Sequence, residues 1–201
     1  MLLAIDTSAG TSVALVDRDR GVLAFRDSSD TRGHAEVIGT FIADCLADSG
    51  IAVGELSGVV AGMGPGPFTG LRVGIAAARS FALGARKPVI PMVSHDALAF
   101  GLTEPTMITT DARRREVYWS LYGGPDDVGL PTRLEGPALA KPDDLLTPDG
   151  YQRLDAATIS AAQLGLLAEA MYVHGRPFAS GEALYLRSPD VTMSAGPKRV
   201  S

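Results

Sequence analysis

Apolar and polar positions in the first half of the chain follow two different periods. Short, nearly continuous apolar runs bounded by turn residues are typical of buried strands, whereas longer stretches that repeat every 3.6 residues are typical of amphipathic helices. The pattern predicts strands at 2–8, 11–19 and 21–29, a helix at 34–50, a strand at 57–64, a helix at 69–86 and a strand at 88–94. This alternation indicates an α/β fold in which helices cover a partly parallel sheet.

The second half of the chain has a weaker pattern. Two strands joined by a basic turn are predicted within 106–123. A helix is predicted at 160–175, because Ser160 and Gln163 form a capping box and Gly175 suits the helix end. Strands followed by a helix in both halves hint at a duplication.

Two further regions have less regular sequences. Residues 124–157 are rich in proline, aspartate and glycine and are predicted to be mostly loop, with one short strand near RLEGPALA (133–140). The segment 182–189 is expected to be a last strand or an extended stretch. The polar tail from Val191 is expected to be loose.

Both helices of the first half carry more apolar surface than one sheet requires. The apolar residues of the helix at 34–49 fill an arc of roughly 180°, against about 100° for a helix that lies on one core. On the next helix, Arg72, Arg79 and Arg86 form one stripe, and nearly all other positions are small or apolar. Part of this extra apolar surface is explained if the two helices cover each other. The remaining apolar surface predicts contact with another subunit. The expected interface residues are Val37, Phe41, Gly74, Ala77, Ala78, Phe81 and Gly84.

Charge and cysteine content exclude several classes of protein. The 201-residue chain has a formal net charge of −5, whereas a chain that wraps nucleic acid by itself needs a basic surface. The single Cys45 excludes a disulfide framework and a cysteine-based zinc site. The start MLLAIDTS is unlike a signal peptide, and no apolar run approaches the roughly 20 residues that span a membrane. These features predict a soluble, cytoplasmic protein with no membrane partner.

The stretch GMGPGPFTGLRVG (62–74) joins a predicted strand to a predicted helix, where glycines can cradle a phosphate. It lacks the Lys-Ser/Thr of a P-loop, and Pro65 and Pro67 remove two backbone donors. We therefore interpret it as a rigid turn that directs the following helix.

The three residues that close the first predicted strand have two interpretations. Asp6, Thr7 and Ser8 suit the binding of a Mg²⁺-nucleotide between two domains, and they are also ordinary turn residues. Local sequence favours neither interpretation, so these residues stay weak candidates for a nucleotide site.

The histidines offer little for a metal site. His34 and His174 lie near predicted helix ends, and the position one turn after His95 is Ala99, so no His-x-x-x-His pair exists. His95 is interpreted as a helix-capping or surface residue. The three arginines at 113–115 are expected to form a charged hairpin turn. The aromatic residues expected to pack in a sheet are Tyr118, Trp119 and Tyr122.

Five stretches, in order and spacing, resemble the TsaB (YeaZ) family. They are LLAIDTS, GHAEVIGTFIADCLADSGI, GMGPGPFTGLRVGIAAARSFA, DARRREVYW and ALYLRSP. The likeness is dense over 1–100, clear at 111–119 and 184–187, and thin between. It implies the actin/hexokinase/Hsp70-type fold with two related subdomains, the second reduced. We place these subdomains at 1–98 and 99–201.

The resemblance also implies a function and partners. The family takes part in making N6-threonylcarbamoyladenosine (t6A) at position 37 of tRNAs that read codons beginning with A. Its members form a heterodimer with the transferase TsaD through the first-domain helices, and the ATPase TsaE joins the pair. Contact with tRNA is expected only through the complex, and the isolated chain could pair with itself. No catalytic residue, cofactor or metal is expected, because the family is regarded as a non-catalytic relative of TsaD.

Departures from TsaD favour a scaffold over an enzyme. TsaD places its His-x-x-x-His metal pair after a strand that aligns with PMVSHDALA, where His95 matches the first ligand and Ala99 replaces the second. A single imidazole would not hold the metal. TsaD's Gly-Gly adenosine motif has no convincing counterpart at Gly123 and Gly124. The main alternative is a nucleotide-dependent phosphotransferase or ATPase of the same fold that uses Asp6. A metallopeptidase is a weaker alternative, because the ligands are missing.

Overall fold

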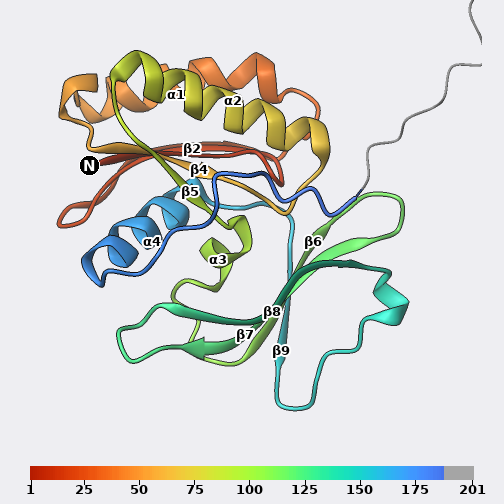
Figure 1. The fold of residues 1–201 in the computed structure, drawn as a ribbon. Coiled ribbons are helices and arrows are strands. Elements are labelled where there is room, and N and C mark those ends of the chain that lie inside the picture. The colour runs from red at the N-terminus through yellow and green to blue at the C-terminus, as the bar shows by residue number, and fades with distance from the viewer. Residues whose placement is uncertain (188–201) are drawn as a thin grey trace, which may run out of the picture.

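Two β-sheets and the helices that cover them form residues 1–187, the part of the chain that the computed structural model describes (Figure 1). The first half comprises β1 (Leu2–Asp6), β2 (Thr11–Asp17), β3 (Gly21–Ser28), α1 (His34–Ser49), β4 (Gly58–Gly62), α2 (Phe68–Ala85), β5 (Val89–Met92) and α3 (Ser94–Ala99). The second half comprises β6 (Thr106–Asp111), β7 (Val117–Pro125), β8 (Pro131–Ala140), β9 (Gln152–Ala156) and α4 (Ala161–Val173). Short 3-10 helices lie at Val53–Glu55 and Pro142–Asp144.

The two sheets repeat one strand order. The first is ordered β3-β2-β1-β4-β5 and the second β8-β7-β6-β9. In each, three consecutive strands pair antiparallel, and the fourth pairs parallel with the first of the three. The second sheet has no counterpart of α1, since only a 3-10 turn separates β8 from β9. The predicted α/β fold of two related subdomains, the second reduced, is confirmed.

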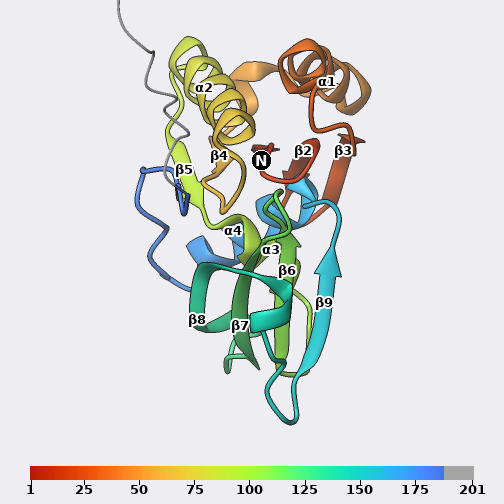
Figure 2. The ribbon, with the colours of Figure 1, turned by 90° about the vertical axis from the view of Figure 1, so that its right-hand side faces the viewer.

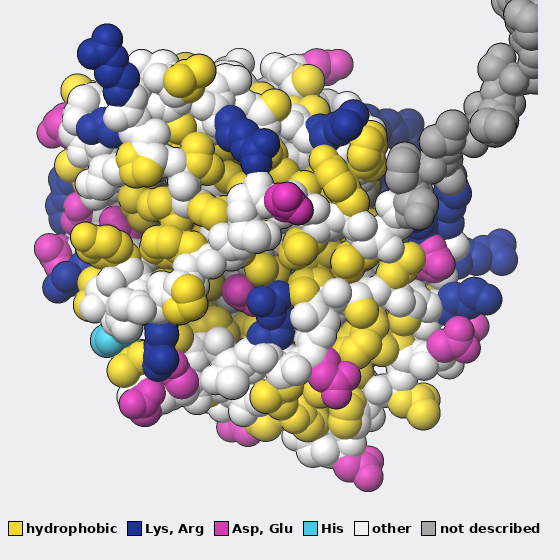
Figure 3. Space-filling model, viewed as in Figure 1, with side chains coloured by type: hydrophobic (Ala, Val, Ile, Leu, Met, Phe, Trp, Pro, Cys, Tyr) yellow, Lys and Arg dark blue, Asp and Glu magenta, His cyan; other side chains and the backbone are white. Residues whose placement is uncertain are grey.

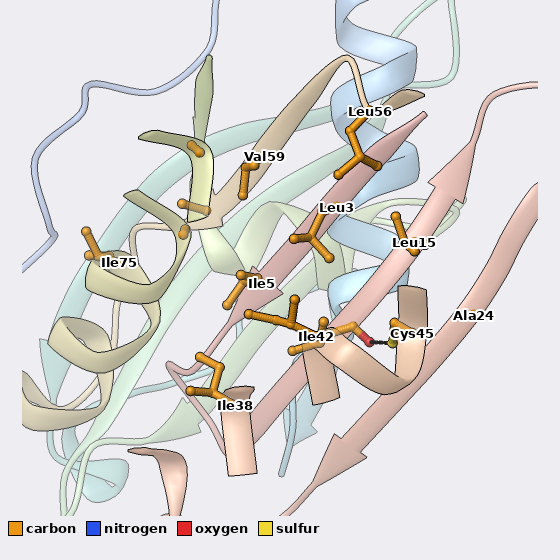
Figure 4. Packing of buried hydrophobic residues seen from close by; sticks show 14 of the residues in the cluster. Leu3, Ile5, Leu15, Ala24, Ile38, Ile42, Cys45, Leu56, Val59 and Ile75 are labelled. Atoms are coloured by element: carbon orange, nitrogen blue, oxygen red, sulfur yellow. Dashed lines mark hydrogen bonds between the residues drawn. The ribbon is translucent and has the colours of Figure 1, made fainter. Parts of the chain in front are cut away.

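Helices cover both faces of the first sheet, which explains why β1 (LLAID) is apolar almost throughout. Alternate side chains of a strand point to opposite faces. Leu3 and Ile5 pack with Ile42 beneath α1 and α2 (Figure 4). Ala4 and Val16 pack against α4 on the opposite face. Each fully buried aliphatic side chain of this kind contributes about 1.5–3 kcal/mol.

The layers follow from this packing. Figure 1 shows α1 and α2 above the first sheet, α4 and α3 below it, and the second sheet beneath α3, and Figure 2 shows the same order after a quarter turn. α4 follows the second sheet in sequence but packs on the first: the N–H of Ala161 donates to the hydroxyl of Ser12 at 2.8 Å. The boundary between subdomains 1–98 and 99–201 remains a proposal, because α4 belongs to the second in sequence but packs on the sheet of the first.

The predicted helices at 34–50, 69–86 and 160–175 are confirmed to within two residues at each end. Residues 124–157 differ from the prediction, because β8 is ten residues long and β9 adds a strand that the sequence did not indicate. Both are edge strands with mostly exposed or half-buried side chains, so neither needs an apolar period. Residues 182–187 form no strand, and the tail from Val191 lies outside the described residues. No helix within residues 1–187 is long and apolar enough to cross a membrane.

The prediction that His95 is a capping or surface residue is wrong. His95 is fully buried at the start of α3, where its Nδ1 lies 2.8 Å from the Ser120 hydroxyl and its Nε2 lies 2.9 Å from the Thr110 hydroxyl. Both partners belong to the second sheet, so the imidazole connects α3 to β6 and β7. Burial lowers the pKa of His95 to about 3.

The buried His95 should make stability fall in acid. In the unfolded chain the imidazole takes up a proton near pH 6.5, whereas in the folded protein it does so only near pH 3. The contribution of His95 to the free energy of unfolding is therefore complete above pH 6.5. It declines by about 1.4 kcal/mol per pH unit as the pH falls toward 3. Urea denaturation of a His95→Gln variant should show a shallower loss of stability over this range. The same change at the exposed His174 should keep the wild-type slope, and equal slopes in all three proteins would contradict the assignment.

Candidate functional site

Two stretches that the sequence singled out, the turn at Asp6–Ser8 and the segment 62–74, lie against each other. The Thr7 hydroxyl donates to the carbonyl of Gly70 at 2.7 Å and accepts from the N–H of Gly74 at 3.0 Å. Those two backbone groups are four residues apart in α2, the pair that an α-helix normally joins directly. Thr7 is buried, and its hydroxyl therefore connects the end of β1 to the first turns of α2.

The glycines of this segment permit the close approach. A Cβ at Gly74 would lie 2.2 Å from the Thr7 hydroxyl oxygen, and one at Gly70 would lie 2.7 Å from the Thr7 carbonyl oxygen. A Cβ at Gly66 would lie 2.8 Å from the Cα of Ser8. Real Cβ atoms essentially never approach so closely, so each position requires glycine. These glycines serve packing between β1 and α2.

Asp6 is enclosed rather than directed into a cleft. Its Oδ1 accepts hydrogen bonds from the backbone N–H and the hydroxyl of Ser8, at 2.8 and 2.5 Å. Its Oδ2 has no hydrogen-bond partner among the described residues and lies over Gly62, where a Cβ would come within 1.9 Å. Burial raises the pKa of Asp6, and the neighbouring Ser8 and Ser94 hydroxyls act against that rise.

His34 and Ala99, two positions considered for a metal, lie in different surroundings. His34 is buried at the start of α1, where its Nδ1 lies 2.8 Å from the Thr11 hydroxyl, and burial lowers its pKa. Ala99 packs in an apolar cluster with Ile108 and Tyr122. Within the described residues, no three His, Cys, Asp or Glu side chains lie close enough together to hold a metal ion.

A cleft of about 260 Å³ lies between the two subdomains beside this turn. Ser8 and Pro67 line it on the first subdomain, and Asp111 and Arg113 on the second. The Arg113 guanidinium bonds to the Thr31 hydroxyl and forms an ion pair with Asp111, with 3.4 Å between Nη1 and Oδ2. Arg113 therefore spans the two subdomains, and Asp6 is not among the residues that line the cleft.

The residues of the expected interface fall into two groups. Gly74 and Ala78 are buried within the chain, Gly74 against Thr7 and Ala78 in the core, so neither offers surface to a partner. This corrects the expectation for those two positions, because the apolar width of a helix does not reveal which side faces the sheet. The remaining five lie at least partly at the surface: Val37, Phe41, Ala77, Phe81 and the exposed Gly84.

The surface group lies on the facing sides of α1 and α2. His34 on α1 faces Gly70 near the start of α2, because a Cβ at Gly70 would lie 3.2 Å from the His34 Nε2. Val37 and Phe41 lie three and seven residues after His34, and therefore on the same side of α1. Ala77, Phe81 and Gly84 follow Gly70 with the same kind of spacing. Two arginines of the stripe make contacts within this chain: Arg72 lies over the ring of Phe68, 4.0 Å from its centroid, and Arg79 donates to the carbonyl of Gly181 at 2.5 Å.

A segment near the end of the described chain contributes more than its sequence suggested. The N–H of Leu184 donates to the carbonyl of Met63 at 2.8 Å, and the ring of Tyr185 contacts Phe68, with 4.9 Å between centroids. Arg187 forms an ion pair with Glu116 in the second subdomain. Residues 181–187 thus connect α2 to the β6–β7 turn. The motif ALYLRSP was a signal for this segment, but its contacts were not predictable.

Known proteins with similar sequences and structures point to one family. The family described as TsaD, tRNA N6-adenosine threonylcarbamoyltransferase, matches residues 24–178. An uncharacterized protein of Mycobacterium leprae is 38% identical over 206 residues, covering 94% of this chain and 55% of that protein. The tRNA threonylcarbamoyladenosine biosynthesis protein TsaB of Escherichia coli is 33% identical over 147 residues, covering 71% of this chain and 63% of that protein.

The structural comparison covers nearly the whole fold. The structure of YeaZ from Pseudomonas aeruginosa superposes with a TM-score of 0.77 at 25% identity, covering 92% of this chain and 99% of that one. By contrast, this chain spans only 55 to 63% of the two curated relatives named above. The chain belongs to the family of the threonylcarbamoyltransferase TsaD, within its TsaB (YeaZ) branch.

Proposed function

We propose that this chain is a non-catalytic subunit in the synthesis of t6A at position 37 of tRNAs that read codons beginning with A, and that it pairs with a TsaD transferase. The names of the TsaB relatives from Escherichia coli and Haemophilus influenzae support the pathway. The observation that carries the non-catalytic role is the hydroxyl of Thr7, which bonds to Gly70 and Gly74 inside the chain.

A phosphate site at the Asp6–Ser8 turn would need polar groups that are already engaged. The Thr7 hydroxyl already donates one hydrogen bond to the backbone of α2 and accepts another from it. The Ser8 hydroxyl donates to Asp6. Asp6 is itself buried with a raised pKa, which disfavours the ionised form that binds Mg²⁺. Position 99 is apolar and buried, so the metal pair of TsaD has no second ligand here. These features favour a supporting role over a phosphotransferase or ATPase.

The facing sides of α1 and α2 supply the proposed contact with TsaD. Val37, Phe41, Ala77 and Phe81 are half-buried apolar residues, and these two helices form the outermost layer of the first subdomain (Figures 1 and 2). Apolar side chains in such a layer lose further contact with water when a partner covers them. In the absence of TsaD the same surface would pair with a second copy. TsaE would join the assembled pair, and tRNA would be met within the complex.

A charge on the proposed surface should separate the two proteins. Ala77→Glu and Gly84→Glu place a carboxylate where a partner would bury it, and an unpaired buried charge weakens binding by about a hundredfold or more. Gly84 is exposed with nothing within 4 Å of a built Cβ, so that variant has no reason to unfold. Ala43→Glu, exposed on the far side of α1 from Phe41, is the matched control. Calorimetric titration with TsaD measures the effect. Folded variants that all pair normally would refute this interface.

The Thr7 hydroxyl should matter for stability rather than for nucleotide binding. Thr7→Val keeps the shape of the side chain but removes both bonds to α2, so the free energy of unfolding should fall by about 1–3 kcal/mol. Thr40→Val, at an exposed position of α1, should change it by less than about 0.5 kcal/mol. Urea denaturation gives both values. Tight ATP binding that is lost in Thr7→Val and in Asp6→Ala, without loss of stability, would support the phosphotransferase or ATPase instead.

A further inference from the structure

A second pocket, of about 380 Å³, lies where three segments distant in sequence meet. These are the start of α2, the β6–β7 turn, and the segment that ends at Arg187. The pocket shares Pro67 and Arg113 with the cleft beside Ser8, but it is also lined by Thr69 and Tyr185, which the cleft does not contact. Its volume falls within the range of ligand sites in proteins.

The pocket is lined by positive charge in an acidic protein. Arg113, Arg114 and Arg187 line it, and no Asp or Glu is among its ten lining residues within 1–187, although the whole chain has a net charge of −5. At the right-hand edge of Figure 3, Lys and Arg side chains lie beside Asp and Glu side chains. The first turn of the 18-residue α2 also lines this pocket. It contributes the positive end of the helix dipole and the exposed Thr69 hydroxyl.

Two of these arginines are held in place by the protein. Arg113 bonds to Thr31 and Asp111, and the Nη2 of Arg187 bonds to Glu116 and to the carbonyl of Arg113. A guanidinium has five N–H donors, so each side chain can be anchored and still donate to an anion. The turn itself places residues 113–115 in succession in the left-handed region, with φ of 65°, 55° and 62°, which non-glycine residues adopt rarely. The charges are thus positioned before any ligand arrives.

The lining chemistry suits a phosphate. Arginine and hydroxyl side chains and helix N-termini contact nucleic-acid phosphates, and bases are read by hydrogen bonds to their edges, from Asn, Gln, Asp or Glu and, at guanine, from Arg. No Asn, Gln, Asp or Glu lines the pocket within the described residues. The rings of Phe68 and Tyr185 contact each other, and Arg72 lies over Phe68, so no base can stack between those two rings.

We propose that this pocket binds a backbone phosphate of the substrate tRNA, held by Arg113, Arg187 and the start of α2. The inference rests on the proposed function, which supplies the tRNA. A single phosphate contact agrees with the acidic chain, because the basic residues form one local site rather than a broad basic surface. The pocket therefore fixes the position of the tRNA without reading its sequence.

Binding of labelled tRNA, followed by fluorescence anisotropy for the isolated chain and for its complex with TsaD, tests the proposal. Arg113→Gln and Arg187→Gln should each weaken binding about tenfold and reduce the slope of log affinity against log salt by about 1 between about 50 and 200 mM. Thr69→Asp should weaken binding at least as much while remaining folded, because an acidic residue in the first turn favours the helix. Arg20→Gln, on the β2–β3 turn, and Thr40→Asp are the matched controls and should bind within about twofold of wild type.

Four outcomes decide between the proposals. Loss of binding confined to the pocket variants, with normal TsaD pairing in each, supports the proposal. Wild-type tRNA affinity and salt slope in all pocket variants overturn it, as does displacement of tRNA by ATP or AMP bound at the pocket, which would assign the phosphate chemistry to a free nucleotide. A wild-type chain that does not pair with TsaD refutes the proposed function instead, and the tRNA affinities of the isolated variants still decide the role of the pocket.

Discussion

One hydroxyl group determines how the first subdomain fits together. The side chain of Thr7 inserts at the start of α2 and bonds to both a carbonyl and an N–H of the helix backbone. Such an approach requires a helix face without side chains, which Gly70 and Gly74 provide. The contact holds the start of α2 against the end of β1. Two features that the sequence presents separately, a glycine-rich turn and a polar turn, are two sides of a single packing contact.

Much of the fold could be predicted from local patterns, because the strands of the first sheet and the three long helices bury apolar faces with regular periods. The edge strands β8 and β9 could not, since strands with exposed side chains need no such period. His95 was misplaced for a related reason. Its partners Thr110 and Ser120 lie on strands far along the chain, and nothing near His95 in sequence reveals them.

The candidate site shows the same limit. The excess apolar character of α2 was evident from its sequence, but Gly74 and Ala78 turned out to face inward because Thr7 and the sheet occupy that side. A helical wheel gives the width of an apolar face and not its direction. Equally, the three arginines were visible in the sequence, yet only the fold brings Arg113 and Arg187 together at the start of α2. Sites made from distant segments depend on tertiary contacts that a local pattern does not encode.

The placement of α4 affects how the protein is made on the ribosome. Strands β1 and β2 are synthesised first, but the helix that covers one of their faces comes about 150 residues later, as the bond between Ser12 and Ala161 shows. Contacts of such high sequence separation carry a large loop-closure entropy and slow folding. Until α4 has been synthesised, Ala4, Ala14 and Val16 remain open to water and to other nascent chains. The first subdomain therefore cannot complete its core before α4 has left the ribosome.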